Sequence, residues 1–309
     1  AFHRRTVYDL QRAVAHFDTA IAREPGYARA HASLAEVYAL LGAYDYGALP
    51  PQTAFATARA AAKRALAIDP NLAEAHNAMA SVLFNYDWDW SGAEREFVRA
   101  IQLSPSYAAA HHWYALLLQC AGREREAFQA ITRARELDPL SPVIGTALAR
   151  HYYLARRSNE AIAGYRRIAE NDSTFVTARV GLGLSLAAHG EYQAAIEQYQ
   201  TAQRLLPVRT PLIDGLLANA YGRLGARDKA LAHVASIQAV AGQRYVPAEY
   251  LAVAFIGLGD NDRAFQALEQ AFANRSAGLA YLEIEPLVDP LRTDPRFPAL
   301  IEKIRAARK

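Results

Sequence analysis

The chain has 309 residues, of which 52% are hydrophobic and 21% charged, so it can bury a continuous core and is not disordered. With 34 Lys and Arg against 31 Asp and Glu, the net charge of +3 gives no indication of a nucleic-acid-binding surface. The single cysteine, Cys120, excludes a disulfide framework within the chain and a multi-cysteine metal site.

No apolar run approaches the roughly 18 residues that a membrane span needs, and no signal peptide opens the chain. Low cysteine content suits the cytosol and does not exclude the periplasm. We therefore expect a cytoplasmic protein. The alternative is the periplasmic part of a membrane-anchored regulator.

Residues 8–25 hold half of a helical hairpin. Leu10, Val14, Phe17 and Ile21 recur at helical spacing before Pro25. The partner helix is missing or only begun at residues 2–6, and half a hairpin cannot bury its face alone. We therefore expect this chain to be the carboxy-terminal part of a longer polypeptide, with an atypical amino-terminal cap as the alternative.

The first full repeat, residues 28–70, contains an insertion within residues 43–57. The insertion includes Tyr44, Tyr46, Pro50 and Pro51. A Pro-Pro pair is expected to stop a helix and favour extended chain. Insertions in repeat arrays fall on one rim, where many carry function and many are inert.

The second repeat, residues 73–105, has a turn one residue longer than the others, with the sequence NYDWDWSG. We expect a capped turn, in which an Asp or Ser side chain accepts a hydrogen bond from a helix-start amide. One indole, of Trp88 or Trp90, should pack under the loop.

The third repeat, residues 108–139, is the clearest helical hairpin. Gly122 marks the turn, and small residues stand where the two helices must approach. These are Ala115, Ala127 and Ala134. Further repeats follow at residues 142–173, 176–207, 211–242 and 245–276. Prolines at 70, 105, 139 and 207 end helices at spacings of 35, 34 and 68 residues, which fixes the period.

The repeat pattern stops at residue 277. The following segment is rich in proline (Pro286, Pro290, Pro295 and Pro298), and a final helix with a basic end is expected after it. Ile301 and Ile304 of this helix would lie on the last repeat. We therefore expect an array over residues 1–276 and a carboxy-terminal cap over residues 277–309, because a terminal repeat needs its open face shielded.

These features predict an all-α solenoid of antiparallel helix pairs. The series Leu182, Gly183, Gly190, Ala195, Tyr199, Ala202 and Pro207 resembles the tetratricopeptide repeat, and so does the series Leu34, Ala35, Tyr38 and Gly42. The resemblance covers residues 8–276. It implies a right-handed superhelix whose first helices line a concave groove that binds a peptide or a protein.

A narrower resemblance rests on residues 84–115, 134–142 and 281–304. These stretches look like the carboxy-terminal repeats of bacterial multidomain regulators. In such proteins a winged-helix DNA-binding domain, a nucleotide cyclase or a serine/threonine kinase precedes the repeats. The resemblance therefore implies a covalently preceding output domain.

If the repeat geometry holds, one face of the first helices forms a partner-binding groove. Its aromatic, amide and cationic side chains suit a peptide segment. The predicted groove residues are Asn77, Ser81, Phe84, Asn85, His112, Trp113, Leu116, Arg150 and Tyr153. Packing between neighbouring helices is the alternative role for His112 and Trp113. No Lys occupies the positions with which family members clamp two carboxylates, so that ligand class is not expected.

His31, His76 and His111 occupy the same position in successive repeats. Equivalent helices lie at least ~8–10 Å apart, whereas zinc–nitrogen bonds are about 2 Å. One ion cannot join these side chains without distortion, so we expect structural histidines and no metal.

No catalytic constellation is visible. Cys120 has no histidine partner at helical spacing, and the glycines do not form phosphate-binding loops. We expect a non-enzymatic interaction or sensing module without a cofactor, which binds a protein or peptide and binds no nucleic acid. The alternative function is a structural scaffold that forms homo-oligomers.

Overall fold

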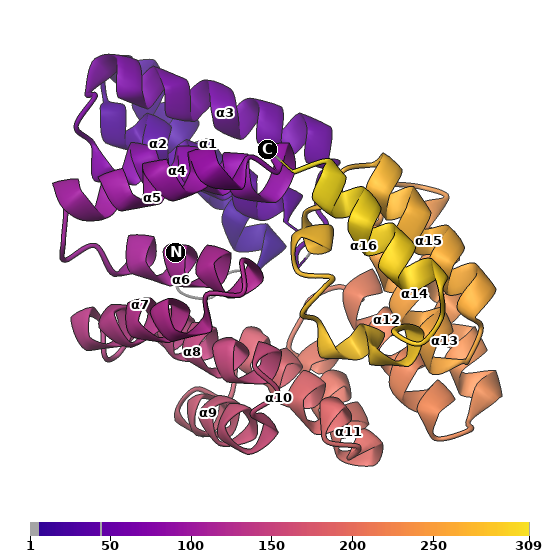
Figure 1. The fold of residues 1–309 in the computed structure, drawn as a ribbon. Helices are drawn as coiled ribbons and strands as arrows, with labels where there is room; N and C mark the ends of the chain where they lie inside the picture. The colour runs from indigo at the N-terminus through magenta and orange to yellow at the C-terminus, as the bar shows by residue number, and fades with distance from the viewer. Residues whose placement is uncertain (1–5, 44, 309) are drawn as a thin grey trace. The chain divides into compact units, whose positions relative to one another are not determined.

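The computed structural model describes residues 6–43 and 45–308, so Tyr44 of the predicted insertion lies outside the described residues. In those two ranges the regular elements are helices, and no strand occurs. Consecutive helices pack as antiparallel pairs (Figure 1), which confirms the predicted all-α solenoid of helix pairs. The α-helices are α1 Val7–Arg23, α2 Ala28–Gly42, α3 Pro51–Ile68, α4 Ala73–Val82, α5 Trp90–Leu103, α6 Ala108–Cys120, α7 Glu124–Leu137, α8 Pro142–Leu154, α9 Ser158–Asn171, α10 Val176–Ala188, α11 Tyr192–Arg204, α12 Pro211–Arg223, α13 Arg227–Ala241, α14 Glu249–Gly257, α15 Asn261–Ala273 and α16 Arg296–Ala306. The shorter elements are η1 Leu83–Asp87, η2 Ala277–Ala280 and η3 Pro286–Leu291.

The chain divides into two compact units. Unit 1 comprises the chain up to Ile144, Arg275–Ala280 and the described residues after Ala306. Unit 2 comprises Gly145–Asn274 and Tyr281–Ala306. The predicted division into an array over residues 1–276 and a cap over residues 277–309 stays a prediction.

The pair α6 and α7 shows how the sequence builds each hairpin. Gly122 takes the left-handed conformation, with φ of 75°, so the chain reverses within two residues of the end of α6. Ala127 and Ala134 are fully buried and Ile131 is 2% exposed. Small side chains let the two helices approach, and the larger ones fill the space between them. The predicted packing roles of Ala127 and Ala134 are confirmed.

Glycines on α10 make room for tyrosine rings of the neighbouring helices. A Cβ atom at Gly183 would lie 2.4 Å from the ring of Tyr199, which is only 1% exposed and cannot move aside. Gly183→Ala is therefore expected to lower the free energy of unfolding by about 1–2 kcal/mol. Overpacking costs ~1–3 kcal/mol, and the helix preference of Ala returns up to ~1 kcal/mol.

Urea unfolding followed by circular dichroism checks this expectation. The matched control is Gly26→Ala, because a Cβ at Gly26 meets nothing within 4 Å. The control should stay within ~0.5 kcal/mol of the wild type. Equal losses for the two variants would contradict the packing argument.

The predicted insertion folds differently from the expectation. Pro50 is extended, with ψ of 135°, but Pro51 is the first residue of α3. A proline at the first helical position loses no hydrogen bond, and its fixed φ already suits a helix. The expectation that the Pro-Pro pair stops a helix is therefore wrong. The pair starts α3, which runs for 18 residues.

The extra residue of the second repeat is absorbed by a π-helical turn, η1, between α4 and α5. Trp88 follows it in the left-handed conformation with φ of 56°, and its side chain is 1% exposed. Asp89 then caps α5, because its carboxylate accepts a hydrogen bond from the Gly92 amide at 2.8 Å. The predicted capped turn over a buried indole is confirmed.

The last elements also follow the sequence pattern. The final helix, α16, contacts α15, and it buries Ile301 and Ile304 to 6% and 1% exposure. An ion pair at 2.8 Å joins Arg296 of α16 to Asp262 of α15. The first helix of the last pair, α14, begins at Glu249, two residues after Pro247.

Candidate functional site

The predicted groove residues of unit 1 stand on the first helices of successive pairs. These helices are α2, α4 and α6, and α4 contacts both of the others. In stacked helical repeats the first helices share one face. We define the unit 1 face by Glu36, Asn77, Tyr107, His112 and Trp113.

A polar cluster marks this face. The Glu36 carboxylate accepts a hydrogen bond from Asn77 Nδ2 at 3.0 Å and another from the Tyr107 hydroxyl at 2.7 Å. Burial and the neighbouring Glu36 charge raise the pKa of Tyr107 well above its ordinary value, so Tyr107 stays a phenol donor at neutral pH. Asn77 is fully buried, and its Oδ1 accepts no hydrogen bond from the described residues. The side chain of Asn77 therefore belongs to the interior beneath the unit 1 face.

The aromatic part of the face comes from two neighbours on α6. The rings of His112 and Trp113 stack with 4.6 Å between their centroids. His112 is 8% exposed, whereas Trp113 is half-buried against the apolar cluster that contains Leu10, Val37 and Leu41. The ring of Trp113 therefore packs on one side and remains partly exposed.

The other predicted groove residues of unit 1 lie inside the helix stack. Phe84 is fully buried and meets the Trp90 ring edge-on. The Ser81 hydroxyl donates to the Asn77 carbonyl at 3.1 Å, and Asn85 Nδ2 donates to the Ser81 carbonyl at 2.9 Å. Their polar groups thus bond back to their own helix turn, and Leu116 is 8% exposed.

The two predicted groove residues of unit 2 contact the chain's own carboxy-terminal segment. The guanidinium of Arg150 lies 5.0 Å from the centre of the Tyr281 ring. The hydroxyl of Tyr153 donates a hydrogen bond to Glu285. A binding role for the nine sequence-predicted residues stays a prediction.

Sequence reasoning missed Glu36 and Tyr107 in unit 1, and Glu285 in unit 2. Tyr107 and Glu36 are 71 positions apart, and the repeat register alone does not say that they meet. A weak signal is present, because Tyr107 follows a helix-ending proline by two residues, as Tyr27 does.

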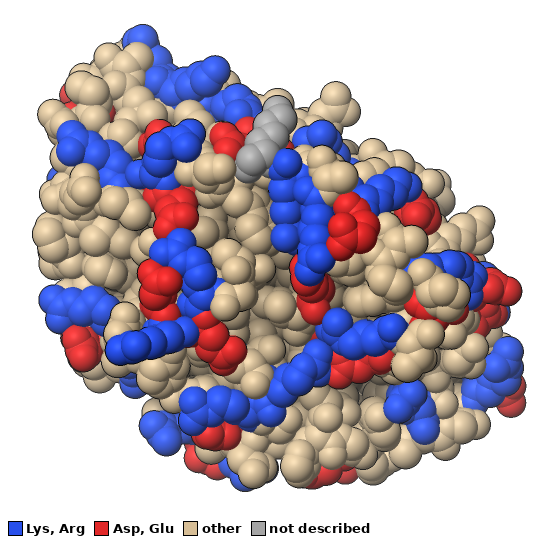
Figure 2. Space-filling view, viewed as in Figure 1, with Lys and Arg blue, Asp and Glu red and all other residues tan. Residues whose placement is uncertain are grey.

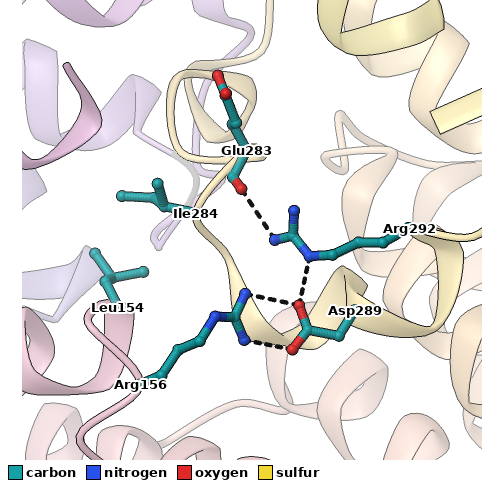
Figure 3. Close-up of a pocket in the computed structure, with 6 residues that line it drawn as sticks. All are labelled: Leu154, Arg156, Glu283, Ile284, Asp289 and Arg292. Atoms are coloured by element: carbon teal, nitrogen blue, oxygen red, sulfur yellow. Dashed lines mark hydrogen bonds and ion pairs between the residues drawn. The ribbon is translucent and has the colours of Figure 1, made fainter. Parts of the chain in front are cut away.

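A cleft of about 660 Å³ opens beside the carboxy-terminal segment within unit 2. Figure 3 shows two guanidinium groups converging on Asp289 in this cleft: Arg156 Nη2 lies 2.8 Å from Asp289 Oδ1, and Arg292 Nε lies 2.6 Å from it. Burial raises the pKa of Asp289, but the hydrogen bonds from Arg156 and Arg292 outweigh it and lower the pKa overall. The cleft lining is Leu154, Arg156, Glu283, Ile284, Asp289 and Arg292.

The three aligned histidines make the same hydrogen bond in successive repeats. Nε2 of His31, His76 and His111 lies 3.1, 3.0 and 3.0 Å from the carbonyl oxygen of the proline six residues earlier. Each ring therefore ties the loop after one pair to the first helix of the next. Within the described ranges, no cluster of three His, Cys, Asp or Glu side chains could hold a metal ion. Cys120 is buried in α6.

His151 gives unit 2 a predicted sensitivity to acid. Burial, reinforced by the positive charge of Arg157, lowers the pKa of His151 to about 4. The unfolded chain takes up the proton at a pH of about 6.5. The stability that neutral His151 contributes is therefore fully present above about pH 6.5. As the pH falls to 4, the free energy of unfolding decreases by up to ~3 kcal/mol.

His151→Gln is expected to flatten this part of the stability profile, measured by urea unfolding between pH 7 and 4. His16→Gln is the control, because His16 is exposed on α1. Equal slopes for the wild type and His151→Gln would show that His151 does not set this pH dependence.

Among the described residues, no helix is both long and apolar enough to span a bilayer. Basic and acidic side chains are interspersed over the face that Figure 2 shows. This mixture fits the small net charge of +3.

Comparison with known proteins shows which repeats and which solved structures the chain resembles. A tetratricopeptide repeat model matches residues 9–47 and 146–209. The solved structure of PilW, a widely conserved type IV pilus biogenesis factor, has a TM-score of 0.54 at 18% identity over 70% of this chain and 94% of PilW. PilF of Pseudomonas aeruginosa has a TM-score of 0.50 at 18% identity over 72% of this chain and 95% of PilF. No curated protein matches the chain. These matches show that the chain is similar to tetratricopeptide repeat proteins over residues 9–47 and 146–209 and shares the fold of PilW and PilF.

Proposed function

We propose that this chain binds a protein or peptide partner, as the docking or sensory carboxy-terminal part of a larger bacterial regulator. The match of a tetratricopeptide repeat model to residues 9–47 and 146–209 supports the interaction role. The likeness of residues 84–115 and 281–304 to repeats that follow winged-helix, cyclase or kinase domains supports the regulator role. The unit 1 face carries the argument for binding.

The partly exposed ring of Trp113 is the observation that favours a peptide ligand. Its inner side packs against the cluster that contains Leu10, Val37 and Leu41, which holds the ring in place. Trp113 offers a partly exposed ring as an anchor, and the partly exposed carboxylate of Glu36 attracts donor or basic side chains. An extended peptide with an apolar and a basic side chain matches both groups.

The test is capture of partners by the immobilised full chain, followed by quantitative mass spectrometry. Trp113→Ala and Glu36→Gln should each lower capture of the same proteins about tenfold or more, the effect of an interface residue worth ~1.4 kcal/mol or more. Gln129→Ala, at an exposed position on α7, is the matched control. Identical capture by all four proteins, with unchanged helicity, would place the site elsewhere.

The regulator role has a separate test. The coding sequence upstream of residue 1 is expected to continue into a winged-helix, cyclase or kinase domain. A gene that starts within a few codons of residue 1 would instead indicate a free-standing adaptor. Sedimentation of the full chain tests the alternative scaffold function. A scaffold should show a molecular mass that rises with protein concentration, and it should capture no partner.

A further inference from the structure

Residues 281–292, which we call the strap, lie along helix faces of unit 2. η3 within the strap contacts both α10 and α14. Leu287 packs against the core cluster that contains Leu182 of α10 and Val253 of α14. The strap therefore contacts helices that belong to two different pairs.

The strap meets α8 and the turn after it at three regularly spaced points. Arg150 lies over the Tyr281 ring, Tyr153 donates to Glu285, and Arg156 forms a two-bonded ion pair with Asp289. The contacting residues are three apart on one side and four apart on the other, so the two segments run side by side in the same direction. Arg150 and Tyr153 stand at positions where the repeat register predicts contacts to a ligand.

The backbone at Arg156 is independent evidence that this contact is built into the fold. Arg156 adopts φ of 62°, a left-handed conformation that costs a non-glycine residue roughly 1–2 kcal/mol. The turns after α6, α10, α12 and α14 place glycine in this conformation, with φ of 75°, 89°, 77° and 70° at Gly122, Gly190, Gly225 and Gly259. The turn after α8 instead holds the strained residue Arg156, and the side chain of Arg156 pairs with Asp289 of the strap.

The strap is also held in shape by its own bonds. Arg292 Nη2 donates to the Glu283 carbonyl at 2.9 Å and to the Glu285 carbonyl at 3.3 Å. The Leu287 amide donates to the Glu285 side chain at 3.2 Å, which caps η3. An acidic, proline-containing peptide ordered in this way loses little further freedom when it binds.

We propose that the α8 face of unit 2 is a recognition site for an acidic, proline-containing peptide, and that the strap is its built-in ligand. In this site Arg150 contacts Tyr281, Tyr153 contacts Glu285 and Arg156 contacts Asp289. Because the strap is part of the same chain, its effective concentration is in the ~mM range, so it excludes free peptides of the same chemistry. The inference does not depend on the partner proposed for the unit 1 face.

The test uses the full chain and a fluorescent synthetic peptide with the sequence of residues 281–292. A strap variant combines Glu285→Gln with Asp289→Asn, which weakens the strap and leaves the α8 face intact. A second variant adds Arg156→Ala to it. The control is Asp262→Asn, whose side chain is 89% exposed and pairs with α16 rather than with α8.

Amide exchange of residues 281–292 should be about tenfold to a hundredfold faster in the strap variant, as expected for lost hydrogen bonds to charged groups, while exchange of α16 stays unchanged. The strap variant should bind the peptide. The wild type and the control should not bind it, and Arg156→Ala should weaken binding at least tenfold. Unchanged exchange in the strap variant, or an opened strap without peptide binding, would overturn the proposal. If the double substitution abolishes helicity, Asp289→Asn alone takes its place with the same outcomes.

Discussion

Phe84→Ala is expected to lower the free energy of unfolding by about 3–5 kcal/mol, the usual cost of removing a buried aromatic ring. Phe84 is 0% exposed, and its ring centroid lies 5.5 Å from that of Trp90. The surrounding helices cannot close the space that the ring leaves, so the cavity adds to the lost burial. Urea unfolding followed by circular dichroism measures the effect.

Leu140→Ala is the control for Phe84→Ala, because Leu140 is a large apolar residue that is 92% exposed. Its substitution should change the free energy of unfolding by less than ~0.5 kcal/mol. Comparison of the two variants also distinguishes a core role of Phe84 from a role in ligand binding. Wild-type stability combined with weaker partner binding in Phe84→Ala would make the ring a ligand contact rather than a core residue.

Asp214→Ala is expected to cost about 3 kcal/mol, because it removes the shared acceptor of a buried network. Asp214 is 1% exposed. Its carboxylate accepts from Arg209 Nη2 at 2.6 Å, His233 Nδ1 at 2.7 Å and the Ser236 hydroxyl at 2.9 Å. The substitution leaves these donors without their acceptor and removes the polar link between α12 and α13. Asp228→Ala, on the exposed side of α13, is the matched control.

The pH dependence of Asp214→Ala gives a second measurement. Burial raises the pKa of Asp214, but the hydrogen bonds from His233, Arg209 and Ser236 outweigh burial and lower the pKa overall. The contribution is therefore complete above the unfolded value of about 3.9 and is lost as the pH falls through the folded pKa. The stability of the variant should approach that of the wild type in acid. A constant difference from pH 7 down to pH 3 would contradict this account.

The fold was predictable from the sequence because each hairpin depends on contacts between residues that are close along the chain. The positions of Ala127, Ile131 and Ala134 recur with the repeat, and each is at most 2% exposed. Gly122 and the helix-ending prolines give the turns. The Pro50-Pro51 pair does not follow the expectation, because a proline ends a helix in its interior but suits the first helical position, where Pro51 lies.

The candidate sites were less predictable because their contacts join distant repeats. Glu36 meets Tyr107 across 71 positions and Tyr153 meets Glu285 across 132. Helical periodicity shows which face a residue occupies, but not whether that face is filled by another part of the chain. Arg156 carries a local clue, since it replaces the glycine found in comparable turns.

The separation of Tyr153 from Glu285 also sets an order of events during synthesis. The ribosome makes α8 well before the strap, 132 positions earlier, and chains are made at roughly 5–20 residues per second. For several seconds the nascent chain carries the α8 face without its ligand. During that interval the face is accessible to chaperones or to a neighbouring nascent copy, and a message cut short before the strap would release a chain with this face permanently uncovered.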